Sequence, residues 1–250
     1  MTSTLTLASV HAKYNLIETL RIPIAVIGTV VFPSLAFLFF VVPQSSQFDA
    51  ATATQAVISL SVFSLCVGSL FNFGLTIAEN REKPWDPYLR TLPASGPARI
   101  LGHLIATGGL SLFSLLPLVV LGALLTEATA TPLQMLLGLI ALAITSLPFM
   151  LMGICIGYAM PTKAAIAVIQ VLFFALAFGG GLFLPPQMFP NWLEAVSRFL
   201  PSRHARELSI WAVQGGELPV FALVGAVAWI VGLAVLAIVL YRRDEGRRFR

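Results

Sequence analysis

Residue types that usually carry out chemistry are few in this sequence and lie far apart. The three histidines, His11, His103 and His204, fall on three separate segments, and no group of histidines and cysteines has the spacing of a metal site. A nucleotide-binding Walker A motif ends in Gly-Lys followed by Ser or Thr, but the three lysines here precede tyrosine, proline and alanine. The sequence therefore predicts no catalytic residue and no metal site in this chain.

The segment 79–99 combines charges of both signs with large apolar side chains, among them Trp85, Tyr88 and Leu89. Asp86 followed by Pro87 is typical of a helix start. Aromatic residues and arginine are enriched in the cores of protein interfaces, so the segment predicts a short helix that docks a partner subunit. The alternative is anchoring at the membrane surface, because Trp and Tyr also favour the headgroup region.

The composition indicates the elements that must position this segment. Apolar residues make up 58% of the 250 residues and charged residues only 10%, whereas soluble domains carry about 25% charged residues. A soluble fold of this length could not cover so much apolar surface. The apolar runs are continuous and of the length that membrane-spanning helices need, about 20 residues. We therefore expect an all-α integral membrane protein with a single transmembrane domain over residues 1–250.

Six spans are predicted, with approximate limits at 22–42, 56–78, 100–125, 133–158, 164–184 and 218–241. Of the 15 basic residues, 12 fall on one side of such a membrane topology, and Arg198, Arg203 and Arg206 fall on the other. Because cytoplasmic loops carry the excess of basic residues, both termini are expected to be cytoplasmic, in the cell membrane. Both cysteines lie inside spans, so no external disulfide is predicted.

The N-terminal residues predict an amphipathic helix. Leu7, Val10, Tyr14 and Ile17 follow one another at steps of three and four, which places them on one helical face. We expect this helix to lie along the cytoplasmic membrane surface; an ordinary soluble leader is the alternative. The first apolar run has 21 residues, which is too long for the core of a cleaved signal peptide.

The outer segment from about 184 to 217 is too apolar for a free loop and too often broken for a span. It predicts two short re-entrant helices that dip into the outer leaflet and form a cap over the pathway, with Arg198 and Arg203 at its wet rim. The cap residues are Gly181, Pro185, Pro190, Trp192 and Pro201.

Polar groups deep in the spans are the candidates for a substrate pathway. Asn72 and Gln170 are the strongest of these, although buried amides also commonly bond a neighbouring helix. Gly153 and Gly157 have the spacing that allows close helix packing, and we expect that packing to lie within the chain.

Two segments resemble the membrane permeases of ATP-binding-cassette type-2 exporters. The first runs from Arg81-Glu82 through Leu92-Pro93 to Leu101-Gly102, with Pro84-Trp-Asp-Pro87 in place of the Gly-Thr that this family tends to show. The second is Gly181-Leu-Phe-Leu-Pro-Pro-Gln-Met-Phe-Pro-Asn-Trp-Leu193, followed by Phe199-Leu-Pro201. The order of the predicted spans is also similar over the whole chain.

The resemblance implies a working unit of two permease subunits and two ATPase subunits. ATP and Mg²⁺ would then bind in the partner ATPase, this chain would hold no cofactor, and the helix after residue 79 would couple the two proteins. The residues assigned to coupling are Glu79, Arg81, Glu82, Trp85, Tyr88, Leu89, Arg90 and Lys163. The second permease would be another copy of this chain or a homologue, and nucleic acid is not an expected partner.

The expected substrate is an amphiphile, because the predicted walls are apolar and aromatic. Export of a drug or antibiotic is favoured by the resemblance, and a lipid or lipid-linked glycan is an alternative. Two other classes stay open at this point: a channel or ion-coupled carrier that works without ATP, and a membrane scaffold that transports nothing.

Overall fold

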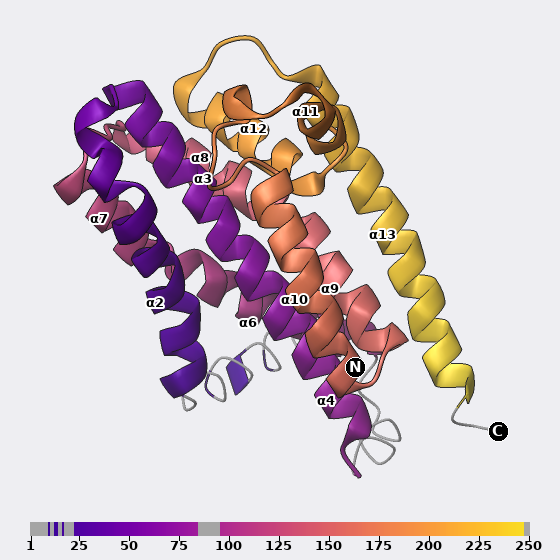
Figure 1. The fold of residues 1–250 in the computed structure, drawn as a ribbon. Coiled ribbons are helices and arrows are strands. Elements are labelled where there is room, and N and C mark those ends of the chain that lie inside the picture. Colours follow the sequence, from indigo (N-terminus) through magenta and orange to yellow (C-terminus); the bar gives the residue numbers. More distant parts are fainter. Residues whose placement is uncertain (1–9, 11–12, 15–16, 18–22, 85–95, 248–250) are drawn as a thin grey trace.

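The computed structural model describes residues 23–84 and 96–247, together with residues 10, 13, 14 and 17. Over these residues the chain is helical and contains no strand (Figure 1). Five helical segments are long and apolar enough to cross a membrane: Ala50–Glu82, Ile105–Leu125, Pro132–Ala159, Thr162–Gly179 and Val220–Asp244. The all-α prediction is confirmed for the described part of the chain. The first of the six predicted spans stays a prediction, because the apolar helical stretch found there, Val31–Gln47, is shorter.

All the described elements are helical. In chain order they are α2 (Pro23–Phe40), the 3-10 helix η1 (Val42–Gln47), α3 (Ala50–Ser69), the π-helix η2 (Leu70–Leu75), α4 (Thr76–Glu82), α6 (Gly96–Phe113), α7 (Leu116–Leu125), α8 (Pro132–Thr145), α9 (Leu147–Ala159), α10 (Thr162–Gly179), the 3-10 helix η3 (Pro186–Met188), α11 (Asn191–Ser197), α12 (Pro201–Gln214) and α13 (Val220–Arg247).

Local chemistry explains where these helices begin. Asp49 caps α3 by accepting a hydrogen bond from the backbone N–H of Thr52. Thr131 and Gln134 form a reciprocal capping box at the start of α8. Two of the predicted spans are interrupted: the third divides into α6 and α7, and the fourth into α8 and α9. Each second half carries a proline at its second residue, Pro117 or Pro148, where a proline lacks the N–H that would continue the preceding helix.

The centre of the bundle is the continuous helix formed by α3, η2 and α4. Its side chains Phe63 and Phe73 are fully buried, and α9 packs directly on η2. A Cβ at Gly153 would lie 2.9 Å from the carbonyl oxygen of Ser69, and one at Gly157 would lie 2.9 Å from that of Gly74. The prediction that these glycines serve packing within the chain is confirmed.

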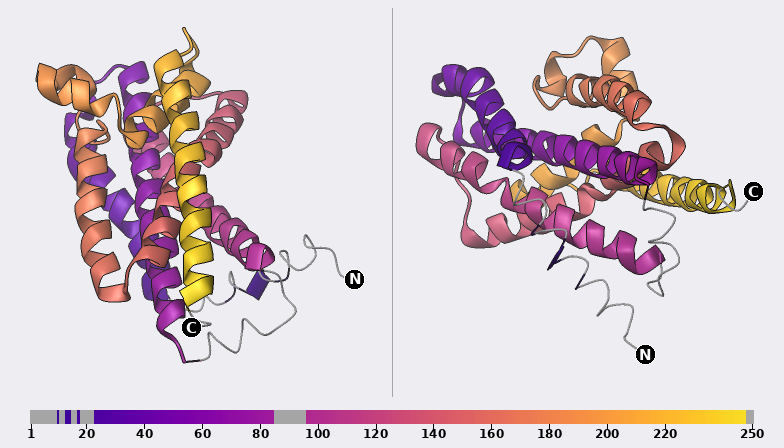
Figure 2. Two further views of the ribbon diagram at one scale, coloured as in Figure 1. Left: turned by 90° about the vertical axis from the view of Figure 1, so that its right-hand side faces the viewer. Right: turned by 90° about the horizontal axis from the view of Figure 1, so that it is seen from below.

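The molecule has two distinct ends. α11 and α12 lie together at one end, whereas α4, the turn between α9 and α10, and the last turns of α13 meet at the other (Figure 1). α13 runs along one side of the bundle, and α6 is inclined to it (Figure 2). α10 stops at Gly179, before the predicted limit of 184, because Ser202 of α12 packs over Gly180 and donates a hydrogen bond to the carbonyl oxygen of Leu176.

Candidate functional site

The end of the molecule at α4 is held together by Arg81. Its Nε and Nη2 atoms donate to Oδ1 of Asp244 on α13, at 3.0 and 2.6 Å. Its Nη1 atom donates to the carbonyl oxygens of Gly157 and Met160 at the end of α9, at 2.8 and 3.3 Å. The Asp244 side chain is only 5% exposed and that of Arg81 21%. Arg81 therefore fixes α4 to both α9 and α13.

Glu82 connects the same turn of α4 to a third helix. Its Oε1 atom accepts a hydrogen bond of 2.8 Å from the backbone N–H of Thr162, the first residue of α10. A carboxylate is favoured at a helix N-terminus because of the free N–H groups there. We call the contacts of Arg81 and Glu82 with Asp244, Thr162 and the carboxyl end of α9 the α4 clamp.

The α4 clamp changes the interpretation of the predicted coupling residues. Arg81 and Glu82 make contacts within the chain, whereas Glu79 and Lys163 are exposed beside them. Trp85, Tyr88, Leu89 and Arg90 lie outside the described residues. Asp244 was missed by sequence reasoning, because the tail around it is mostly basic and was interpreted through its positive charge. The useful signal was an acidic pair, Asp244-Glu245, at the end of an apolar helix.

The opposite end contains the two helices predicted between the last two spans. α11 follows Pro190 and α12 begins at Pro201, which is buried. Gly181 adopts a φ of 75°, and a Cβ there would lie 2.7 Å from Cγ of Pro186, so the turn after α10 requires glycine. The other expected cap residues lie outward: Pro185, Pro190 and Trp192 are all exposed.

The Trp192 side chain is not buried by the rest of the subunit. It is 68% exposed, so it contributes little to the packing of this subunit. It lies near the start of α11, a short helix that offers no enclosing surface around the indole. Any burial of Trp192 must therefore come from lipid or from another chain.

The expectation that Arg203 lies at a wet rim is wrong. Its side chain is 11% exposed, and its Nε atom lies 3.1 Å from Oε1 of Glu207. Arg206, on the same helix, is buried and donates hydrogen bonds to Ser59 of α3 and to Glu207. Burial lowers the pKa of both guanidinium groups, and Glu207 opposes that shift. Arg206 is buried because its side of α12 packs against α3. Of the three arginines, only Arg198 is exposed as expected.

His204, also on α12, is another buried side chain to which the sequence analysis assigned no role. Its Nε2 atom lies 2.8 Å from the carbonyl oxygen of Arg198, so that nitrogen carries the proton. The ring packs directly on Gly225 of α13, where a Cβ would overlap it. Burial, together with the nearby charge of Arg203, lowers the pKa of His204. The neutral imidazole joins α12 to α13.

The two candidate pathway residues occupy different surroundings. Asn72 is half-buried in η2, and a Cβ at Gly68 would lie 3.9 Å from its Nδ2 atom. Gln170 is exposed on α10, on a helix whose Val171, Phe174 and Phe178 are also exposed. A role for either residue in a pathway stays a prediction.

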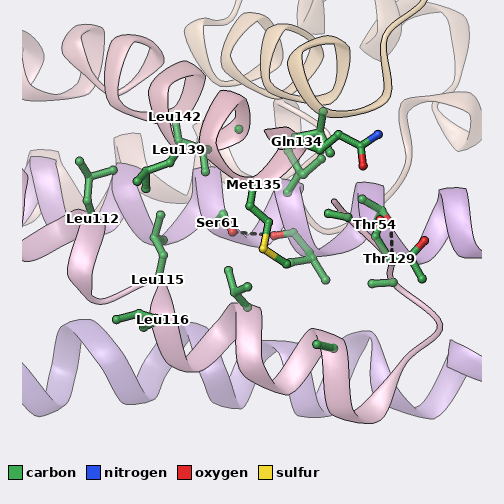
Figure 3. Close-up of a pocket in the computed structure, with 18 of the residues that line it drawn as sticks. Thr54, Ser61, Leu112, Leu115, Leu116, Thr129, Gln134, Met135, Leu139 and Leu142 are labelled. Atoms are coloured by element: carbon green, nitrogen blue, oxygen red, sulfur yellow. Dashed lines mark hydrogen bonds between the residues drawn. The ribbon is translucent and has the colours of Figure 1, made fainter. Parts of the chain in front are cut away.

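A pocket of about 550 Å³ lies between α3, α6, α7 and α8 (Figure 3). Its walls are mostly aliphatic. Figure 3 shows Thr54, Thr129 and Gln134 gathered at one end, whereas Leu112 and Leu142 lie at the other. No charged residue lines it among the residues that the structure describes.

Comparison with known proteins identifies the family. The model for the ABC-2 type transporter matches residues 6–213, which is most of the chain. The chain belongs to this family. It is also 22% identical over 230 residues to the putative transport permease YvfS of Bacillus subtilis (strain 168), a match covering 91% of this chain and 94% of that protein. The chain is therefore a multi-pass membrane protein of a transport permease family.

Proposed function

We propose that this ABC-2 family member is the permease subunit of an ATP-driven exporter. Two copies, or one copy with a homologous permease, work with two copies of a separate ABC ATPase that binds ATP and Mg²⁺. The observation that carries this proposal is the α4 clamp. Arg81 and Glu82 join α4 to α9, α10 and α13. A movement of α4 that a bound ATPase causes would therefore be transmitted to these three helices.

Coupling requires that the ATPase contact two permease states differently, since a partner shifts an equilibrium only through differential affinity. Closure of the ATPase dimer on residues 85–95 would move α4, and the α4 clamp would transmit the movement to the other helices. The exposed residues Glu79 and Lys163 border the same surface. They would contact the ATPase directly, whereas Arg81 and Glu82 act inside the permease.

The proposed topology has six spans, with α2 as the first, and both termini in the cytoplasm. It places the α4 clamp at the cytoplasmic face and α11 and α12 at the outer face as re-entrant helices. The excess of basic residues at the α4 end supports this orientation.

The proposed substrate is an amphiphilic compound, with a drug or antibiotic as the first choice and a lipid or lipid-linked glycan as the second. The exposed side of α10 supports a pathway between two permease subunits, because Phe174 and Phe178 offer aromatic surface beside the amide of Gln170. Large exposed apolar faces indicate contact with lipid or protein.

The experiment uses proteoliposomes that contain the permease with a co-expressed ABC ATPase. Replacing Trp85 and Leu89 together by alanine should reduce co-purification of the ATPase or separate ATP hydrolysis from export. Phe39 and Leu124, exposed apolar residues on α2 and α7, provide the matched double alanine control, which should transport normally. Transport by the permease alone would support the channel or carrier alternative. Absence of transport with every ATPase tested would support the scaffold.

A further inference from the structure

The pocket between α3, α6, α7 and α8 exists because small residues and helix breaks leave space there. The α6–α7 break at Ser114 and Leu115 bends this span, so α6 and α7 do not form one straight wall. Gly109 lines the pocket, and a Cβ added to it would meet no atom within 4 Å. Side chains of the neighbouring helices therefore do not fill this volume, which is within the range of about 300–1,000 Å³ of ligand sites.

Several polar groups at the polar end have a partner within the chain. The Thr54 hydroxyl donates to the carbonyl oxygen of Ala50 and accepts from the backbone N–H of Thr129. Oε1 of Gln134 accepts from the backbone N–H of Thr131, and the Ser61 hydroxyl donates to the carbonyl oxygen of Val57. Among the described residues, the pocket thus offers no charge to an ionic ligand. Its inner part can be matched only by an apolar body.

The pocket is continuous with the outer surface of the bundle. Leu116 of α7 and Met135 and Leu139 of α8 line it and are also strongly exposed. In a multi-pass membrane protein, apolar side chains on such helices face lipid. The bilayer therefore supplies alkyl chains directly at the opening, and the polar end near Thr129 lies where the loop between α7 and α8 leaves the helices.

We infer that the pocket binds one alkyl chain of a membrane phospholipid, which enters between α7 and α8. The chain lies along Leu112, Leu115 and Leu142, and the headgroup stays outside, near Thr129 and Gln134. This binding is separate from transport and from the ATPase. Lipid tails are as apolar as leucine, so a tail that moves from the bilayer into the pocket removes no additional apolar surface from water. Binding at this site is therefore favoured by close packing of the tail against the pocket walls.

The test uses the full chain in phosphatidylcholine nanodiscs that contain a trace of phosphatidylcholine with a diazirine in the middle of one acyl chain. After illumination, mass spectrometry maps the labelled residues. We expect labelling of Leu112, Leu115 and Leu142 to exceed that of exposed residues on α13, such as Val231 and Val235, by about tenfold. Gly109→Leu should reduce pocket labelling at least fivefold and leave α13 labelling unchanged.

Gly232→Leu is the matched control, because Gly232 lies on α13 and a Cβ there also meets no atom within 4 Å. It should leave pocket labelling unchanged. Equal labelling of the pocket and of α13 in the unmodified chain would overturn the inference, as would a Gly109→Leu variant that labels like the unmodified chain. If Gly109→Leu fails to elute as a folded protein, Ala123→Leu, on the pocket wall in α7, takes its place.

Discussion

Arg81 donates hydrogen bonds to two helices at once, and neither contact involves residues close to it in sequence. The pair with Asp244 is mostly buried, so each charge helps to compensate the other. Removing one member of a fully buried pair typically costs about 3–5 kcal/mol, whereas replacing both with apolar residues is often neutral. The Arg81 guanidinium therefore has a structural role, and in the proposed function it also transmits movement between helices.

Arg81→Ala is expected to lower the melting temperature of the purified permease, by somewhat less than full burial would imply because Arg81 keeps 21% exposure. The double variant Arg81→Met with Asp244→Leu should recover part of the loss, since no charge is left without a partner. Thermal unfolding followed by tryptophan fluorescence measures both. Arg242→Ala, an exposed neighbour on α13, is the control. Equal melting temperatures for Arg81→Ala and Arg242→Ala would contradict the assignment.

His204 predicts a dependence of stability on pH. Its folded-state pKa is lowered by burial, so as pH falls below about 6.5 the unfolded chain takes up a proton that the folded chain does not. The stabilisation present at neutral pH is therefore lost on acidification, by at most about 1.4 kcal/mol per pH unit. Melting temperatures between pH 7.5 and 5 should fall, and His204→Gln should fall less. Parallel curves for the two proteins would exclude this histidine as the cause.

At the scale of elements, the close packing of α9 on η2 depends on two glycines. Gly153→Ala should force these helices apart, because the added Cβ would lie 2.9 Å from a backbone oxygen that cannot move aside. Overpacking of this kind costs about 1–3 kcal/mol. Gly109→Ala meets no atom within 4 Å and should be neutral or slightly stabilising. Melting temperatures of the two variants provide the comparison, and a neutral Gly153→Ala would mean that α9 can shift freely.

Apolar runs were sufficient to predict the five long apolar helical segments. They did not predict the breaks before Pro117 and Pro148, because the hydropathy of these spans stays high across the breaks. The burial of Arg203 and Arg206 was also missed. A charged residue outside a span is expected in water, and only the packing of α12 on α3 brings Arg206 to Ser59, which is 147 positions away.

At the scale of the whole molecule, the proposed topology places Ser46 outside and Lys163 inside the cell; both residues are exposed. Ser46→Cys should react with a membrane-impermeant maleimide on intact cells, and Lys163→Cys only after permeabilisation. The unmodified chain is the background control, since Cys66 and Cys155 are both buried. Labelling of Lys163→Cys on intact cells would invert the topology.

The Arg81–Asp244 contact can form only late in the synthesis of the chain. Its partners are 163 positions apart, and at about 5–20 residues per second the ribosome delivers Asp244 roughly 8–30 seconds after Arg81. During that interval α4 is already made but its guanidinium lacks its carboxylate, so the α4 clamp is incomplete until translation is nearly finished. A chain that stops before its last turns cannot close the clamp. The unclosed α4 clamp is a structural difference between unfinished and finished chains that the cell's quality control can recognise.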